Sequence, residues 1–293
     1  MVKKRIVVTG ASGYVAGQML PTLREKYDTV LLDASPTTSP ERPHPQNRDV
    51  KDVIVTDLVD PDRTKYQHYF EGADAVVHLG YIRRRENEDI DQYTSQRENV
   101  DMAYNVLRTA YETGVPRVVS ASSNHASDWH ERELIHKRAI ETLDPYALPL
   151  SNNFYGWSKA TYEHLGFIFA SGVFGRKMGV VMVRIGSPAE INFSPGTDPG
   201  NYKRGLGSYV SKRDLTQLFV KAIETPNISN EHNVPWLVVY GISDNTRGFW
   251  SIANARRVLG YKPQDDSEVK FAGDIHRVLI GENKIAGPGR LGI

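Results

Sequence analysis

The sequence predicts an α/β fold, a doubly wound parallel sheet with helices on both faces and a small C-terminal subdomain. Short β-branched runs alternate with helix-like segments along the 293 residues, and several runs are apolar throughout, as is typical of strands covered on both sides. The first run leads straight into a glycine-rich turn. The length allows one large domain or two closely joined ones. We expect the sheet domain in residues 1–186 and the subdomain mainly in residues 187–293, with residues 211–240 returning to the sheet.

The individual elements follow from this pattern. The predicted strands cover residues 5–9, 29–33, 53–57, 75–79, 117–120, 180–185 and 237–240. The predicted helices cover residues 15–26, 98–113, 154–170 and 212–224. Between them lie long irregular segments, 35–50, 124–152 and 187–210, and segments of that length in a compact domain usually serve as binding loops or lids.

The composition narrows the function classes. The 36 Lys and Arg residues nearly balance the 35 Asp and Glu residues, a formal net charge of +1, which argues against nucleic acid as the main partner. The absence of cysteine excludes disulfides, thiolate metal sites and a cysteine nucleophile. No apolar run approaches the roughly 20 residues of a membrane span, and the histidines show no metal-ligand spacing. We therefore expect a cytoplasmic protein with neither a membrane partner nor a metal site.

The turn after the first predicted strand is typical of a phosphate-binding site. Glycine at positions 10 and 13 allows a tight turn and lets backbone N–H groups approach a pyrophosphate, and the helix that follows directs its positive end at the anion. A plain turn without a ligand is the alternative, but the position between a strand and a helix favours a dinucleotide. The residues expected to contact it are Gly10, Ser12, Gly13, Tyr14 and Val15.

Two aspartates follow the next two predicted strands. Asp33 ends the second strand, where a carboxylate accepts hydrogen bonds from the adenosine ribose hydroxyls and repels a 2′-phosphate. This favours NAD over NADP. Asp57 follows the third strand, where it could reach the adenine amino group. The alternatives are an ordinary loop aspartate for Asp33 and a helix cap for Asp57.

A serine-rich strand end and a Tyr-Lys pair carry the chemistry. Tyr155 and Lys159 are four residues apart and share one face of a predicted helix. The Lys159 ammonium and a nicotinamide charge would favour tyrosinate over phenol, so that Tyr155 can act as general base. A serine hydroxyl in the run 120–125, at the end of the neighbouring strand, can hold a substrate hydroxyl toward Tyr155 while hydride passes to the nicotinamide. Taken alone, the pair is equally compatible with an exposed helix face.

Together these motifs resemble the extended short-chain dehydrogenase/reductases, the NAD-dependent epimerase/dehydratase group with a Rossmann fold. The matching positions are Thr9, Gly10, Gly13, Ala16, Asp33, Asp57, Leu58, His78, Leu79, Gly80, Asn99, Val100, Ser122, Ser123, Tyr155 and Lys159. The family normally has glycine where this chain has Ala16, a small-residue variant. The resemblance implies NAD as the cofactor and a homo-oligomer. The further cofactor contacts that it implies are Leu58, Leu79, Gly80, Asn99, Tyr155 and Lys159.

Within this group, the chain resembles bacterial uronate dehydrogenases and archaeal NAD-dependent sugar dehydrogenases, among them a glucose-6-phosphate dehydrogenase. It is carried by the segments 121–125, 155–159, 183–187, 201–202, 239–245 and 258–261. It implies that the anomeric C1 hydroxyl of a cyclic sugar is oxidised to a lactone. By position, Ser123 and Tyr155 become the catalytic pair, and Lys159 tunes the pKa of Tyr155 and anchors the ribose. The implied sugar contacts are Ser123, Asn124, His125, Tyr155 and Ser187. Without the resemblance, His125 is equally a structural residue and Ser187 a plain loop serine.

Basic residues at two places predict an anionic sugar. An arginine after an Asn-Tyr pair grips the substrate carboxylate in uronate dehydrogenases, and here Arg204 or its neighbour Lys203 stands at that position. Where the uronate enzymes have small residues, this chain has Tyr81, Arg83 and the two arginines that follow Arg83. The arginines are either a solvated surface run or part of a pocket for a more highly charged substrate. Residues 126–152 have no clear counterpart in those enzymes, and we expect them to form a lid or a subunit contact.

The leading hypothesis is thus an NAD-dependent dehydrogenase that acts on C1 of an acidic or phosphorylated hexose. A nucleotide-sugar epimerase would use the same Ser, Tyr and Lys, but such enzymes need a larger C-terminal lobe and are usually longer. Dehydratases place acidic residues beside the catalytic serine, where this chain has Asn124 and His125. A non-catalytic NAD-binding regulator is the third hypothesis. Such proteins often lose the tyrosine or the lysine, and both are present here.

Overall fold

The computed structural model describes residues 2–37, 50–83, 89–192 and 198–279. It contains a sheet of seven strands in the order β3-β2-β1-β4-β5-β6-β7, and every neighbouring pair is parallel. The strands are β1 (Arg5–Thr9), β2 (Asp28–Asp33), β3 (Val53–Val55), β4 (Ala75–His78), β5 (Arg117–Ser123), β6 (Gly179–Ile185) and β7 (Trp236–Gly241). The order runs outward in both directions from β1 and β4, which confirms the predicted doubly wound arrangement.

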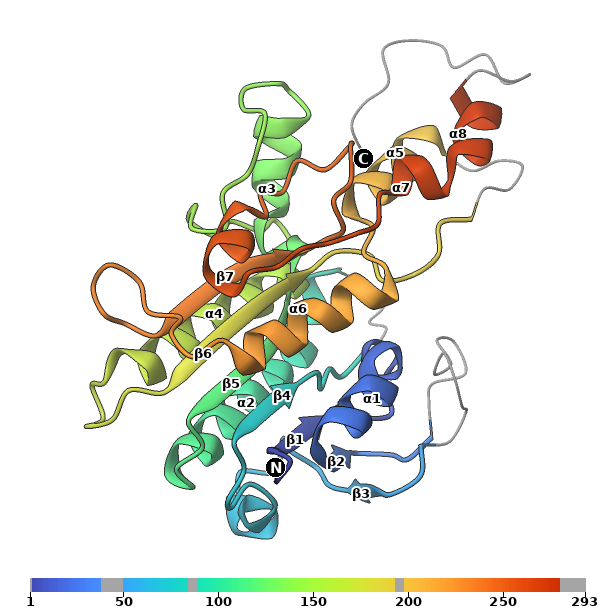
Figure 1. Cartoon of the computed structure of the whole chain (residues 1–293). Coiled ribbons are helices and arrows are strands. Elements are labelled where there is room, and N and C mark those ends of the chain that lie inside the picture. Colours follow the sequence, from blue (N-terminus) through green and yellow to red (C-terminus); the bar gives the residue numbers. More distant parts are fainter. Residues whose placement is uncertain (1, 38–49, 84–88, 193–197, 280–293) are drawn as a thin grey trace.

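Helices cover both faces of this sheet (Figure 1). One face carries α1 (Tyr14–Lys26) and α6 (Lys212–Glu224), and the other carries α2 (Gln92–Glu112) and α4 (Phe154–Ser171). Because successive strand residues point to opposite faces, Val8 packs in the core that includes α1 and α6, whereas Val7 packs in the core that includes α2 and α4. The continuously apolar runs are therefore buried on both sides.

Helix α2 starts earlier than the predicted range 98–113. It begins at Gln92, so Asn99 lies two turns inside the helix instead of near its start. Ser95 and Gln96 in the added turns are buried, but they bond to polar partners: Ser95 Oγ to the Gln92 carbonyl and Gln96 Nε2 to the Tyr81 hydroxyl. Burial of polar side chains leaves no apolar periodicity in the sequence, which is why the pattern missed these turns.

The remaining helical segments are short. They are α3 (Asp128–His130), α5 (Pro199–Ser208), α7 (Ser267–Lys270), α8 (Ala272–Leu279), the 3-10 turns η1 (Arg63–Lys65), η2 (Gln67–Tyr69), η3 (Asp89–Asp91) and η4 (Asn124–Ser127), and the π turns η5 (Glu131–Ile135) and η6 (Ala255–Leu259). Tyr202 and Leu206 of α5 form a small core with Phe271 and Ile275, and Figure 1 shows α5, α7 and α8 grouped together. The division of the chain at residue 186 stays a prediction.

The long segment 124–152 packs against its own chain. It contains η4, α3 and η5, and Leu143 exchanges backbone hydrogen bonds with Phe249 and Ser251, at 2.8 and 3.0 Å. Ile135 and Leu143 share a small core with Trp250. A lid or a subunit contact in this segment stays a prediction. In the parts of the chain that the structure describes, no helix is long and apolar enough to cross a membrane.

Candidate active site

A cleft of about 1140 Å³ opens where the strands of the sheet end, which is where doubly wound sheets bind ligands. Most of the predicted site residues line it: Gly10, Ser12, Gly13, Tyr14, Val15, Asp33, Asp57, Leu58, Leu79, Gly80, Arg83, Ser123, Asn124, His125, Tyr155, Lys159, Ser187 and Arg204. Asn99 is the exception, because its side chain is fully buried below the cleft. Its Oδ1 accepts from Ile82 N at 2.7 Å and its Nδ2 donates to Ile82 O at 2.9 Å. Asn99 thus holds the chain after β4 instead of lining the cleft.

The glycine turn is formed by a backbone that only glycine adopts without strain. Gly10 has φ +69°, and a Cβ atom there would lie 2.6 Å from Gly80 N and 2.6 Å from the Leu79 carbonyl carbon. Gly13 N then donates to Gly10 O at 3.0 Å, and α1 begins at the next residue. Glycine at position 10 therefore lets the turn after β1 pack directly against the chain after β4.

Asp33 lies at the end of β2, beside this turn. Its Oδ2 accepts a hydrogen bond from Ser12 N at 2.9 Å. Burial raises the pKa of the Asp33 carboxyl, and the backbone N–H groups of Ser12, Ser35 and Ala34 oppose that rise. Asp57 also lines the cleft, and its Oδ1 accepts from Val59 N at 2.9 Å. The cap of the next helical turn is Asp62 instead. The contact of Asp57 to adenine stays a prediction.

Tyr155 and Lys159 lie on the first turns of α4. The helix begins there because Asn153 Oδ1 accepts from Gly156 N at 2.8 Å, an N-terminal cap. Lys159 is 4% exposed, and its Nζ donates to Ala121 O at 3.1 Å. Nζ also lies 6.0 Å from the ring centre of Tyr155. Burial lowers the pKa of the Lys159 ammonium to about 7.

Ser123 ends β5 and lines the same cleft. Its Oγ accepts from His125 N at 3.2 Å, which fixes the hydroxyl at the strand end. The next turn packs tightly on α4, because a Cβ atom on Gly156 would lie 2.1 Å from His125 O. The glycine beside Tyr155 therefore lets η4 reach the helix. Ser123 and Tyr155 are 32 residues apart in the sequence, and the fold brings them to one cleft.

The predicted basic residues differ in whether they line the cleft. Arg204 lines the cleft, but its Nε and Nη2 donate to the two carboxylate oxygens of Glu131 at 2.7 and 2.9 Å. Its Nη1 makes no hydrogen bond to any described residue. Lys203 does not line the cleft. Arg83 lines it and is exposed, whereas the two arginines that follow, Arg84 and Arg85, lie outside the described residues.

The comparisons with known proteins agree with this geometry. The model of the NAD dependent epimerase/dehydratase family matches residues 6–183. The chain belongs to this family. The resemblance drawn from the motifs is thereby confirmed, and the protein is an NAD-dependent oxidoreductase of the extended short-chain type.

Similar members of the family cover nearly the whole chain. An NAD-dependent glucose-6-phosphate dehydrogenase of Haloferax volcanii is 34% identical over 275 residues, 92% of this chain and 97% of the relative. A uronate dehydrogenase of Pseudomonas syringae is 30% identical over 267 residues, 90% and 83% of the two chains. The solved structure of a mutated uronate dehydrogenase superposes with a TM-score of 0.72 at 25% identity, over 99% of this chain and 92% of the other.

The cleft of this epimerase/dehydratase family member fits NAD. Gly10, Ser12 and Gly13 line it at the start of α1, where backbone N–H groups could hold a pyrophosphate, and the Asp33 carboxylate beside them suits a ribose diol. Lys159 would hold the nicotinamide ribose, as the resemblance implies. In the described parts of the chain, no group of three or more His, Asp or Glu side chains could hold a metal ion.

Sequence reasoning noted Tyr81 but gave it no role. The Tyr81 ring lies edge-on to the Tyr155 ring, with 5.3 Å between the ring centres. Lys159 Nζ lies 5.1 Å from the centre of the Tyr81 ring. The Tyr81 hydroxyl accepts from Gln96 Nε2 at 3.0 Å, and Gln96 Oε1 accepts from Ser158 Oγ at 2.9 Å. Tyr81 therefore helps to enclose the Lys159 ammonium in aromatic surface. No sequence motif signals this, since Tyr81 follows β4 and lies far in sequence from Tyr155 and Lys159 of α4.

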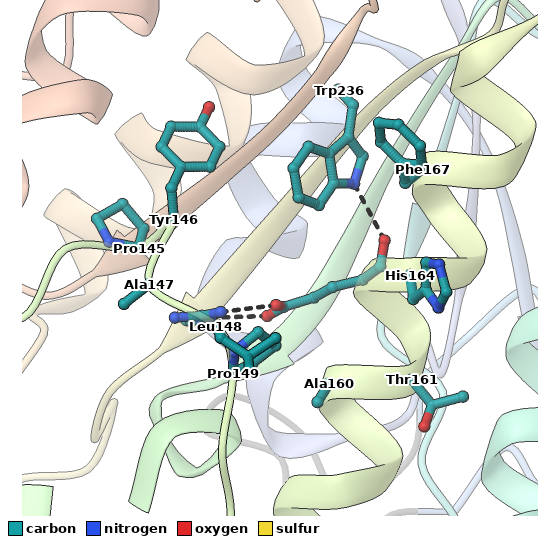
Figure 2. A pocket seen from close by; sticks show the side chains of 12 residues that line it. Pro145, Tyr146, Ala147, Leu148, Pro149, Ala160, Thr161, His164, Phe167 and Trp236 are labelled. Atoms are coloured by element: carbon teal, nitrogen blue, oxygen red, sulfur yellow. Dashed lines mark hydrogen bonds and ion pairs between the residues drawn. The ribbon is translucent and has the colours of Figure 1, made fainter. Parts of the chain in front are cut away.

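A second cavity, of about 400 Å³, lies along α4. Figure 2 shows it between the segment from Pro145 to Pro149 and the side chains of Phe167 and Trp236. Its lining is mainly apolar, and Glu163 and Arg184 in its wall already bond to each other. The predicted residues Ser123, Tyr155 and Lys159 all line the larger cleft, which is therefore the candidate active site.

Proposed function

We propose that this enzyme oxidises the anomeric C1 hydroxyl of a cyclic acidic or phosphorylated hexose to the lactone, with NAD as the hydride acceptor. The observation that carries the proposal is the meeting of Ser123, Tyr155 and Lys159 in one cleft whose other end holds Asp33. The substrate class is supported by the relatives, which are named as glucose-6-phosphate and uronate dehydrogenases.

In the proposed mechanism, Ser123 Oγ holds the C1 hydroxyl toward Tyr155. Tyr155 takes the hydroxyl proton as general base, while the hydrogen on C1 leaves as hydride. Bound NAD supplies the acceptor for that hydride. The products are the lactone, NADH and one proton. Lys159 favours the tyrosinate through its charge, and its burial beneath Tyr81 and Tyr155 strengthens that effect, because the local dielectric is low.

Charged groups at the sugar end support an anionic substrate. Asn124, His125 and Ser187 are the proposed hydroxyl contacts, and Arg204 and Arg83 are the proposed contacts to the anionic group. With Nε and Nη2 of Arg204 engaged by Glu131, Nη1 is the nitrogen left to donate to a substrate oxygen. Arg83 adds a second cation at the cleft.

Neither alternative function gains support from a specific observation. Solved nucleotide-sugar epimerases superpose with TM-scores of 0.62–0.65 but at 15–20% identity, which shows a shared fold alone. A non-catalytic regulator is disfavoured because Ser123, Tyr155 and Lys159 are all retained in one cleft.

The test is NADH formation with purified protein and a sugar panel. The panel contains glucuronate, galacturonate, glucose 6-phosphate, a sulfonated glucose, glucose and UDP-glucose. We expect NADH and the lactone with an anionic hexose, and loss of turnover in Tyr155→Phe with NADH binding nearly intact. Conversion of UDP-glucose to its epimer without net NADH would instead support the epimerase. Turnover by Tyr155→Phe within a few-fold of wild type would remove the assigned base.

A further inference from the structure

His125 and Asp128 form a hydrogen-bonded pair at the wall of the cleft. His125 Nδ1 lies 2.8 Å from Asp128 Oδ2 and 3.0 Å from Oδ1. The His125 side chain is 39% exposed and lines the cleft, whereas the Asp128 side chain is 8% exposed. The carboxylate is thus buried, and it does not line the cleft, whereas the imidazole bonded to it does. The ring centre of His125 lies 5.6 Å from that of Tyr155.

We propose that Asp128 is a positioning residue that fixes the tautomer of His125, so that Nε2 of His125 offers a lone pair to a hydroxyl of the sugar. A carboxylate has no proton to give, so the nitrogen beside it must carry one. Nδ1–H therefore donates to Asp128, and in the neutral ring Nε2 becomes an acceptor. Carboxylates behind functional histidines set ring orientation in this way in many sites. The inference rests on the proposed function of the cleft.

A second hydrogen bond ties Asp128 to the helix of the general base. Asn153 Nδ2 donates to Asp128 Oδ2 at 2.7 Å, and Asn153 Oδ1 caps the first turn of α4 at Gly156 N. One buried carboxylate therefore links the ring of His125 to the turn that carries Tyr155. The sugar contact and the base are positioned relative to each other through Asp128.

The other charged groups near Asp128 are already paired. Arg204 Nη2 lies 3.9 Å from Asp128 Oδ1, but its hydrogen bonds go to Glu131. Glu131 also lies 3.5 Å from His136 Nε2. The short contacts of the Asp128 carboxylate are thus those to His125 and Asn153. This leaves His125 as the cleft-facing group on which Asp128 acts most directly.

The test is a double-mutant cycle on the full chain with a sugar that the panel shows to be oxidised. Asp128→Asn keeps the shape of the side chain but offers an amide donor as well as an acceptor, so the tautomer is no longer fixed. We expect kcat/KM for the sugar to fall about tenfold, the effect of one lost hydrogen bond, while the dissociation constant of NADH stays within twofold of wild type. In the His125→Ala background, Asp128→Asn should change kcat/KM less than twofold. The control is Glu133→Gln, an exposed acid on the same segment that pairs with Lys137.

A full tenfold effect in the His125→Ala background would show that Asp128 acts through Asn153 and the fold, and it would overturn the proposal. So would wild-type kinetics in Asp128→Asn.

A spectroscopic measurement separates this inference from the proposed function. In protein with 15N-labelled histidine, the ring-nitrogen signals missing from His125→Ala identify this residue among the nine histidines. We expect a protonated Nδ1 and an unprotonated Nε2 in the wild type at mildly alkaline pH. A protonated Nε2 with a bare Nδ1 would overturn the inference, whatever sugar is oxidised and even if Asp128→Asn does not fold. Absence of turnover with every sugar would overturn the proposed function and leave this tautomer as the test of the pair.

Discussion

Glu163 and Arg184 form a two-bonded ion pair inside the protein, next to the active-site helix. Arg184 Nε donates to Glu163 Oε1 at 2.8 Å and Nη2 donates to Oε2 at 2.7 Å, with both side chains 3% exposed or less. Ser122 Oγ also donates to Glu163 Oε1, at 2.7 Å. Since Glu163 lies one turn after Lys159 on α4, and Ser122 precedes Ser123 on β5, the pair fixes the two elements that carry the catalytic groups.

Removing one partner of this pair should destabilise the fold strongly. Glu163→Ala leaves the Arg184 guanidinium buried without its carboxylate, and we expect a loss of about 3–5 kcal/mol in the free energy of unfolding. Urea unfolding of the wild type and the variant measures it. Glu112→Ala is the matched control, because Glu112 pairs with Arg108 and Arg63 at the partly exposed surface, where solvent screens the charges, so its loss should cost much less. If both variants lost the same free energy of unfolding, the buried pair would not be a major source of stability.

The sequence predicted the sheet well because its signal is local. Each strand is a short apolar run bounded by a turn, and the parallel sheet buries both faces of such runs. The start of α4 was equally readable, since Asn153 caps the helix one residue before Phe154. The start of α2 was not, because Ser95 and Gln96 are buried by hydrogen bonds to side chains and carbonyls that no periodicity reveals.

In the candidate site, too, some features could be predicted from the sequence and others could not. Gly10, Asp33, Tyr155 and Lys159 stand at fixed offsets from strands and helices, so their common cleft was predictable. The pairing of Arg204 with Glu131 was not, because the two lie 73 residues apart and meet only through the packing of segment 124–152. Such long-range partners are set by tertiary packing and leave no mark on local sequence.

Asp33 should determine the choice between NAD and NADP. Its carboxylate lies beside the glycine turn and would repel a 2′-phosphate, so Asp33→Ala removes both that repulsion and the ribose hydrogen bonds. We expect the ratio of kcat/KM for NAD to that for NADP to fall at least about tenfold. Asp57→Asn is the control, since an adenine contact serves both cofactors equally. An unchanged ratio in Asp33→Ala would remove the ribose assignment.

The buried Lys159 ammonium should give stability a specific pH dependence. Burial lowers its pKa from 10.5 to about 7. Below pH 7 the group is charged in the folded and the unfolded chain, so the folded state bears the full desolvation penalty. As the pH rises from 7 toward 10.5 the folded chain loses this proton first, and the penalty disappears.

Lys159→Met should therefore be more stable than the wild type at pH 6, by at most about 5 kcal/mol. The gain should shrink steadily between pH 7 and 10. Thermal unfolding of the cofactor-free proteins across this range measures it. Lys51→Met, a change of an exposed lysine, should show no such trend. A gain from Lys159→Met that is constant with pH would mean that packing, and not charge, is responsible.

Arg204 should distinguish acidic from neutral sugars. Its Nε and Nη2 are held by Glu131, so the guanidinium is fixed at the cleft with Nη1 left for the substrate. Arg204→Ala removes a charge-assisted hydrogen bond, and we expect KM to rise roughly tenfold or more for a uronate or a sugar phosphate, with less than about threefold change for glucose. Arg213→Ala is the control, because this exposed arginine pairs with Asp265 and does not line the cleft.

Glu131 provides the second half of that test. Glu131→Gln keeps the size of the side chain but removes the charge that neutralises Arg204, so the cleft becomes more positive. We expect KM for acidic sugars to change while KM for glucose does not, because a neutral sugar does not sense the added charge. Steady-state kinetics with glucuronate, glucose 6-phosphate and glucose measures both variants. Equal effects on all three sugars would show that the Arg204–Glu131 pair supports segment 124–152 and does not recognise the anion.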